Sequence, residues 1–239
     1  MRALFLFPLV FLALVACGGG GSNDSPVPTP TTPPADDLPI AVVDDEGITR
    51  IALQDLATRL DLYALGSLSD EEAAGLAYMR EEEQLAGDVY AVLFSEHGLR
   101  VFENIAASEQ THTEAIGVLL ERYALPDPAT GEPGLFTNTD LQVLYDTLVA
   151  RGSASIYDGL VVGALIEELD IVDLDARMAE VVGNDDILLV YSNLQLASRN
   201  HLRAFYRNLV NRGWDYTPEY LPQDAFDEIV DGEMERPAD

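Results

Sequence analysis

Apolar residues recur every three or four positions along four long stretches of this chain, which is the pattern of amphipathic helices. The clearest stripe crosses the second stretch, where Phe102, Ile105, Ile116 and Leu119 follow one another on a single helical face. No stretch shows the sustained alternation of a long β-strand. The chain is therefore predicted to be all-α, with long helices over residues 70–97, 100–123, 156–182 and 185–212.

Signals at the predicted helix ends support this division. Ser69 and Glu72 have the spacing of a capping box at the start of the first helix, and Gly98 is a natural stop at its end. A loop with three prolines and two glycines, followed by a shorter helix over residues 139–150, separates the second and third long helices. The pattern predicts a four-helix bundle over residues 69–213.

Two further segments flank the predicted bundle. Residues 38–68 are expected to form a short helical lead-in that packs against it. The tail, residues 214–239, is expected to place three aromatic side chains on the bundle before it frays. These are Trp214, Tyr216 and Tyr220.

The N-terminus has the architecture of an export signal. A positive start is followed by an apolar run up to residue 16, too short to span a bilayer as a helix, which predicts a signal peptide over residues 1–16. The single cysteine, Cys17, directly follows Leu-Val-Ala, and this motif resembles the lipobox of bacterial lipoproteins. The resemblance implies cleavage and lipidation at Cys17, with residues 18–37 as a Gly/Ser/Pro-rich tether. The alternatives are a chance cysteine after a signal peptide or an uncleaved anchor.

The net charge of the chain argues against some classes of binding partner. The formal net charge is −29, and all 13 basic residues are arginines. Such an acidic surface argues against nucleic acid and against electrostatic adhesion to anionic lipid. It fits a domain held at the cell envelope by its lipid alone. The acidic surface would also raise the local concentration of cations, which favours delivery of metal ions to the protein. The alternative is that it keeps the protein soluble in a salty or acidic habitat.

Each predicted long helix carries a Glu or a His inside its apolar stripe, where burial costs several kcal/mol unless the group is paired. The second helix has Glu109 and His112, three positions apart on one face. The other helices contribute Glu83, Glu167 and His201. Four helices that direct carboxylates and imidazoles at one axis are typical of a carboxylate-bridged metal centre.

Several positions stay open at this point. Helical register selects Glu83 from the run Glu81–Glu83, and the other two carboxylates are expected in solvent. Glu82 is the alternative to Glu83 as a ligand.

On the fourth helix a serine, Ser198, stands where a second Glu-x-x-His step would place an acid before His201. The alternative to a metal is a buried network in which Glu, His and Arg satisfy one another. Three acids of the third helix lie within half a turn, and any of them could face the axis: Glu167, Glu168 and Asp170.

Four blocks of sequence around these residues resemble an uncharacterised prokaryotic ferritin-like family, known as a domain of unknown function (family 2202). The blocks are residues 79–90, 104–112, 163–171 and 197–205. The resemblance implies a ferritin-like four-helix bundle with a long crossover between helices two and three. It establishes no activity.

A more distant similarity links the chain to rubrerythrin. Glu83, Ala86 and Tyr90 have the spacing of the first ligand helix of that family, which favours Glu83 over Glu82. The similarity fails at Ser198, and the chain lacks the cysteines of a rubredoxin-type iron site. These departures leave open full di-iron occupancy and a rubrerythrin-like electron supply.

The sequence thus predicts an exported, lipid-anchored metalloprotein with a dinuclear iron or manganese site, because oxygen and nitrogen ligands suit these ions. Its expected reactions are oxidation of Fe(II) or reduction of peroxide, with Tyr90 or Tyr191 as a hydrogen-bond or electron donor. The alternative is a non-catalytic metal-binding or protein-interaction module on the same bundle, and a homodimer remains open. The predicted ligands are Glu83, Glu109, His112, Glu167, Asp170 and His201.

The lipid anchor gives a first testable prediction. Replacement of Cys17 by serine removes the thiol that would carry the lipid, and acyl chains contribute about 0.8 kcal/mol of membrane affinity per buried methylene. We therefore expect Cys17→Ser to release the protein from the membrane fraction or to block its maturation, as measured by fractionation and gel mobility. Unchanged fractionation and mobility would contradict the anchor.

Overall fold

The computed structural model describes residues 40–44 and 48–236. The predicted signal peptide, Cys17 and the tether lie outside the described residues. All described residues belong to a compact unit that spans Pro33–Asp239.

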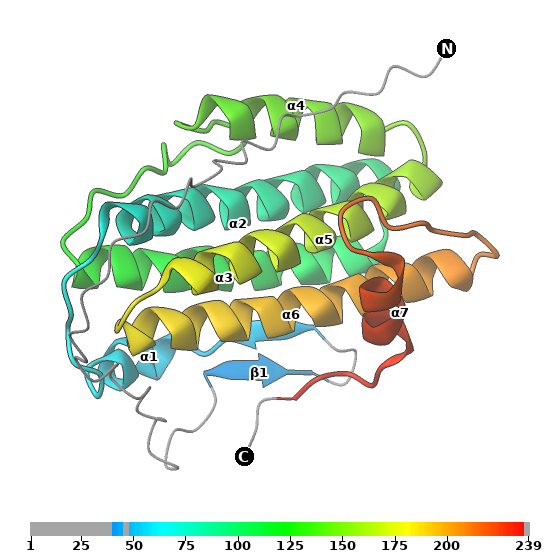
Figure 1. The fold of residues 1–239 in the computed structure, drawn as a ribbon. Helices are drawn as coiled ribbons and strands as arrows, with labels where there is room; N and C mark the ends of the chain where they lie inside the picture. Colours follow the sequence, from blue (N-terminus) through cyan, green and yellow to red (C-terminus); the bar gives the residue numbers. More distant parts are fainter. Residues whose placement is uncertain (1–39, 45–47, 237–239) are drawn as a thin grey trace, which may run out of the picture. The chain divides into compact units, whose positions relative to one another are not determined.

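Four long helices lie side by side and form a bundle (Figure 1). They are α2 (Asp70–His97), α3 (Arg100–Arg122), α5 (Ile156–Glu180) and α6 (Asp185–Val210). The predicted all-α bundle is confirmed, and the helix ends fall within about two residues of the predicted ones. Within the described part of the chain, none of these helices has the length and apolar character needed to cross a membrane.

The direction of the helices explains the long crossover. Tyr90 of α2 contacts Glu167 of α5, and Arg122 at the end of α3 contacts Asp186 at the start of α6. Neighbouring helices are antiparallel, so α3 and α5 run in the same direction. The chain must therefore return along the bundle before α5 begins, and α4 (Thr139–Gly152) makes this return against α2 and α5 (Figure 1).

The predicted capping signals are present at both ends of α2. The Ser69 hydroxyl accepts the backbone N–H of Glu72 at 3.0 Å, and the Glu72 carboxylate accepts the N–H of Ser69 at 2.7 Å. Gly98 ends the helix with φ at 67°, a left-handed conformation that glycine adopts without strain.

The run Glu81–Glu83 differs from the prediction that two of its acids would be solvated. All three side chains are buried. The Glu81 carboxylate accepts backbone N–H groups of Thr137 and Asn138, which precede α4. The acid thus ties the crossover to α2, and a buried carboxylate satisfied by backbone donors needs no solvent.

The lead-in contains a strand pair that the sequence pattern did not predict. The helix expected there is present as α1 (Leu53–Leu60), but it follows an antiparallel pair of β1 (Ala41–Val43) and β2 (Thr49–Ile51). Strands of three residues are too short to show a recognisable alternation. The strand β2 packs on α3 and α6.

The tail packs on the bundle more extensively than predicted. Trp214 and Tyr216 contact the apolar core, whereas the side chain of Tyr220 is 47% exposed. The chain then forms α7 (Gln223–Asp231), which lies against α6, instead of fraying directly after the aromatic residues.

The bundle interior consists of two apolar clusters with a polar layer between them. Tyr90, Phe102 and Phe205 belong to one cluster, and Met79 and Leu119 to the other. The polar layer consists of ionisable residues that are at most 2% exposed: Glu83, Glu109, His112, Glu167 and His201.

The first cluster makes a prediction about Gly163 of α5. A Cβ atom at this position would lie 2.5 Å from the Phe205 ring, which is packed against the rings of Tyr90 and Phe102 and has little room to move. We expect Gly163→Ala to reduce the free energy of unfolding by about 1–3 kcal/mol because of this overpacking. Chemical denaturation measures the change.

Gly117 of α3 is the matched control. A Cβ atom there would lie 3.6 Å from Arg80, an ordinary contact distance. Gly117→Ala should therefore raise the free energy of unfolding by roughly 0.5–1 kcal/mol, the usual gain in a helix interior. Equal stability of the two variants would contradict the close packing at Gly163.

Candidate metal centre

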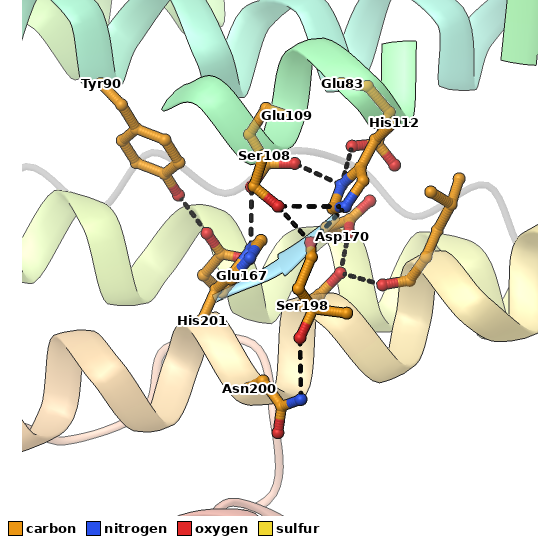
Figure 2. A network of polar contacts seen from close by, with 12 residues as sticks. Glu83, Tyr90, Ser108, Glu109, His112, Glu167, Asp170, Ser198, Asn200 and His201 are labelled. Carbon is orange, nitrogen blue, oxygen red and sulfur yellow. Dashed lines mark hydrogen bonds and ion pairs between the residues drawn. The ribbon is translucent and has the colours of Figure 1, made fainter. Parts of the chain in front are cut away.

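Helix register brings the polar side chains of four helices to one point on the bundle axis (Figure 2). Glu109 and His112 are three residues apart on α3, so both point to the interior. Glu83 reaches them from α2, Glu167 from α5 and His201 from α6. Five of the six predicted metal ligands are thus brought together.

These five residues form two clusters that share one carboxylate. Glu83, Glu109 and His112 make the first cluster, and Glu109, Glu167 and His201 make the second. In each, the candidate ligand atoms lie within 4.8 Å of one another. Glu109 therefore stands in the bridging position between two three-residue sites.

The two histidines present the same ring nitrogen to the carboxylates. His112 Nδ1 lies 2.5 Å from Glu109 Oε2 and 3.3 Å from Glu83 Oε2. His201 Nδ1 lies 2.9 Å from Glu109 Oε1 and 3.5 Å from Glu167 Oε2. The imidazole rings are stacked, with centroids 5.6 Å apart and planes at 14°. The two halves of the site are therefore built alike, on either side of Glu109.

The strand β2 fixes the orientation of His112. Its Nε2 lies 3.0 Å from the carbonyl oxygen of Thr49, which can only accept a hydrogen bond. The proton on Nε2 is thereby held, and Nδ1 is the nitrogen left for a cation. Thr49 also accepts a hydrogen bond from Ser108 at its carbonyl and one from Asn200 at its hydroxyl.

Tyr90 orients the carboxylate on the other side of the site. Its hydroxyl is 2.6 Å from Glu167 Oε1 and donates to that oxygen. Oε2 of Glu167 then faces His201. The hydrogen bond expected of Tyr90 or Tyr191 is thus made by Tyr90, whereas the buried hydroxyl of Tyr191 has no hydrogen-bond partner among the described residues.

The site contains buried polar atoms that the described protein groups leave unsatisfied. Glu83 Oε1, Asp170 Oδ1 and both ring nitrogens of His201 lack hydrogen-bond partners in the described part of the chain. The contact of His201 Nδ1 with Glu109 is close but does not have hydrogen-bond geometry. Unpaired buried groups of this kind are costly. Carboxylate oxygens and one nitrogen of a neutral imidazole offer lone pairs, so the chemistry of these groups fits a bound cation.

Burial and mutual charge shift the pKa values of these groups in opposite directions. Burial raises the pKa of Glu83 to about 7, although His112 opposes the shift. Burial would also raise the pKa of Glu109, but the two imidazoles outweigh it and lower this pKa well below its ordinary value. Burial would lower the pKa of His201, whereas Glu109 and Glu167 raise it to about 9. Without a cation, protons therefore balance the carboxylate charge.

Comparison with known proteins identifies the family. The family described as "Uncharacterized protein domain (DUF2202)" matches residues 72–233. The chain belongs to this family.

Similar proteins align with most of this chain. "Uncharacterized protein MJ0754" of Methanocaldococcus jannaschii is 48% identical over 170 residues, which are 71% of this chain and 91% of the relative. A crystal structure of "hypothetical protein MJ0754" from Methanococcus jannaschii DSM 2661 is similar with a TM-score of 0.70. Its sequence identity is 46%, and the match covers 72% of this chain and 98% of that one.

The remaining predicted ligand of this DUF2202 protein, Asp170, lies beside the two clusters and belongs to neither. It is buried, and its Oδ2 accepts a hydrogen bond from Ser198. The serine that replaces an expected acid on α6 therefore holds an acid supplied by α5. Its role as a ligand stays a prediction.

Glu168, the alternative to its neighbour Glu167, has a different function. Its carboxylate accepts the hydroxyl of Tyr216 and the backbone N–H groups of residues 219–221. It therefore anchors the tail and does not face the axis. Only the tertiary contacts decide this, because Glu167 and Glu168 both lie near the buried face of α5.

Glu82, the alternative to Glu83, is buried but belongs to neither ligand cluster. It contacts the hydroxyl of Tyr78, which also donates to Asp173 at 3.0 Å, and its Oε2 is without a partner among the described residues. Burial and the charges of Asp173 and Asp170 raise its pKa well above the ordinary value. The helical register of the sequence favoured Glu83 over Glu82 as a ligand, but it did not predict that Glu82 would also be buried.

The pKa shifts predict how cation binding depends on pH. Ligands bind a cation in their deprotonated forms, and Glu83 and His201 hold protons up to about pH 7 and about pH 9. The affinity for Mn(II) should therefore rise between about pH 6 and pH 9, with proton release on binding. Titration calorimetry in two buffers of different protonation enthalpy counts the protons. Binding without proton release would contradict the assigned protonation states.

Proposed function

We propose that this protein is a ferritin-like metalloprotein with a dinuclear iron or manganese site, held at the cell envelope by a lipid on Cys17. The observation that carries the proposal is the pair of ligand clusters that share Glu109. One carboxylate between two Glu–His sets is the arrangement expected of a carboxylate-bridged metal pair in a four-helix bundle.

The charge of the site supports two divalent cations. Four buried carboxylates lie in or beside it, those of Glu83, Glu109, Glu167 and Asp170. When ionised they supply four negative charges, which two divalent cations neutralise while the imidazoles are neutral. Buried charges need such compensation because the interior solvates them poorly.

The donor set favours iron or manganese. Carboxylate oxygen and imidazole nitrogen suit these ions, and none of the clustered ligands is a thiolate, which a soft metal would select. The absence of cysteine from residues 18–239 supports the same choice.

The proposed reaction class is oxidation of Fe(II) or reduction of peroxide. An iron pair would supply two electrons, and peroxide takes two electrons and two protons to give two molecules of water. The protein groups position the site: Tyr90 holds Glu167, and Thr49 holds His112. The two apolar clusters keep bulk water from the ligands at both ends of the polar layer.

The proposed location rests on the N-terminal sequence. The apolar run up to residue 16 and the Leu-Val-Ala-Cys motif support export and lipidation at Cys17. The strongly acidic chain would gain little from anionic lipid, so the acyl chains would provide the membrane affinity.

One observation favours a non-catalytic alternative. The close contact of His112 and Glu109 is an ion pair that could persist in a purely structural polar network. A protein-interaction module on the same bundle would then need no metal.

Metal loading tests the proposal. The purified protein is incubated anaerobically with Fe(II), desalted and analysed for iron, and we expect about two ions per chain. Glu109→Ala combined with His112→Ala should abolish binding, because it removes the bridge and one terminal ligand. His201→Gln should lower occupancy by about one ion, because it affects only the second cluster.

His97 provides the control. Its Nε2 lies 2.7 Å from the carbonyl oxygen of Gly152, and it belongs to neither ligand cluster. His97→Gln should therefore bind as much iron as the wild type. Oxygen or peroxide is then added to the loaded protein, and the absorbance of Fe(III) is followed. Binding of iron without faster oxidation than free Fe(II) would favour the non-catalytic alternative, and a folded protein without iron would refute the metal site.

A further inference from the structure

A groove of about 630 Å³ lies over the metal centre, on the face where α2 meets α3. Residues 129 and 131–133 of the crossover form part of its wall. The groove is open to solvent, and Glu83, a ligand of the first cluster, is among the residues that line it. It therefore extends from the surface to one residue of the candidate metal site.

Small side chains line the groove between the two helices. They are Gly87 and Ala91 of α2 and Ala106 and Ala107 of α3. A Cβ atom at Gly87 would lie 3.4 Å from the Cβ of Glu109, so this glycine lies directly against the bridging residue. A larger residue at this position would cover Glu109 from the side of the groove.

An unpaired carboxylate oxygen on a residue of the groove favours a cation as the ligand. Glu83 is 1% exposed, and its Oε1 has no hydrogen-bond partner among the described residues. An unpaired buried acceptor is costly, and on a residue that lines an open groove it suits a cation that arrives through the groove. This observation is independent of the small residues.

The charges around the groove also favour cations. Asp88, Glu114 and Glu132 line it. Arg80 is the basic residue of its lining, and its charge is compensated by Asp127 at 2.8 Å. Acidic walls around a concave surface raise the local concentration of cations and their association rate.

We propose that this groove is the route by which divalent cations reach the metal centre, with Gly87 and the neighbouring alanines keeping it open. The inference rests on the proposed function, because it assigns a path to that same site. Cations would pass between α2 and α3, and the acidic wall formed by Asp88, Glu114 and Glu132 would accelerate their passage.

Obstruction of the groove tests the path. Ala107 is exposed on α3, so Ala107→Trp can place a large ring over the groove without entering the core. The rate of anaerobic Mn(II) binding is measured by stopped flow, and the number of bound ions by metal analysis after long incubation. We expect Ala107→Trp to bind as many ions as the wild type, but about tenfold more slowly.

Ala176 is the matched control, because it is exposed on α5 and does not line the groove. Ala176→Trp should bind Mn(II) at the wild-type rate. Equal rates for Ala107→Trp and Ala176→Trp would overturn the proposed path. A wild-type protein that holds no ion after long incubation would instead refute the metal site itself, so the two failures are distinguishable.

A second pair of variants tests the path without added bulk. Glu114→Gln with Glu132→Gln removes two charges of the groove, and Glu96→Gln with Glu121→Gln removes two exposed charges elsewhere. At low ionic strength the first pair should slow Mn(II) binding several-fold more than the second. Salt at about 0.5 M should remove the difference, since it screens exposed charges. Equal rates at low ionic strength would overturn the role of the acidic wall.

Discussion

The burial of a charged layer in the middle of an apolar bundle is the constraint on which this structure depends. Carboxylates and imidazoles from α2, α3, α5 and α6 meet where water does not solvate them, and apolar clusters lie above and below. An isolated charge would not be stable there, so each group needs a counter-charge within a few ångströms. This requirement fixes the relative register of the four helices, because a slip of α3 by one residue would move Glu109 and His112 away from Glu83 on α2 and His201 on α6.

Protons and cations are alternative counter-charges in this layer. Without a cation, the raised pKa values of Glu83 and His201 mean that bound protons limit the negative charge. Divalent cations would replace these protons and occupy the lone pairs that the protein leaves free. The same residues would therefore determine folding stability, pH dependence and metal affinity, which are linked properties of one site.

The acidic residues around this layer perform several different tasks. Glu81 accepts backbone donors of the crossover, and Glu168 accepts those of the tail, so neither is available to a cation. Thr49, in a strand outside the bundle, fixes the ring of His112 through its backbone carbonyl. The candidate metal centre thus depends on segments far apart in the chain, because the crossover and the tail occupy two neighbouring acids and the strand orients His112.

The sequence by itself determined the four long helices, the caps of α2 and the convergence of five acids and histidines. A period of 3.6 residues places each of these side chains on a known helical face. The three-residue strands left no periodic signal, and Tyr220 proved half exposed. The neighbours Glu167 and Glu168 diverge because Tyr216 and the backbone of residues 219–221 take up the second carboxylate. Sequence periodicity fixes which face of a helix a residue occupies. Only the tertiary structure decided whether a buried acid meets a cation site or a backbone donor, because those partners come from elsewhere in the chain.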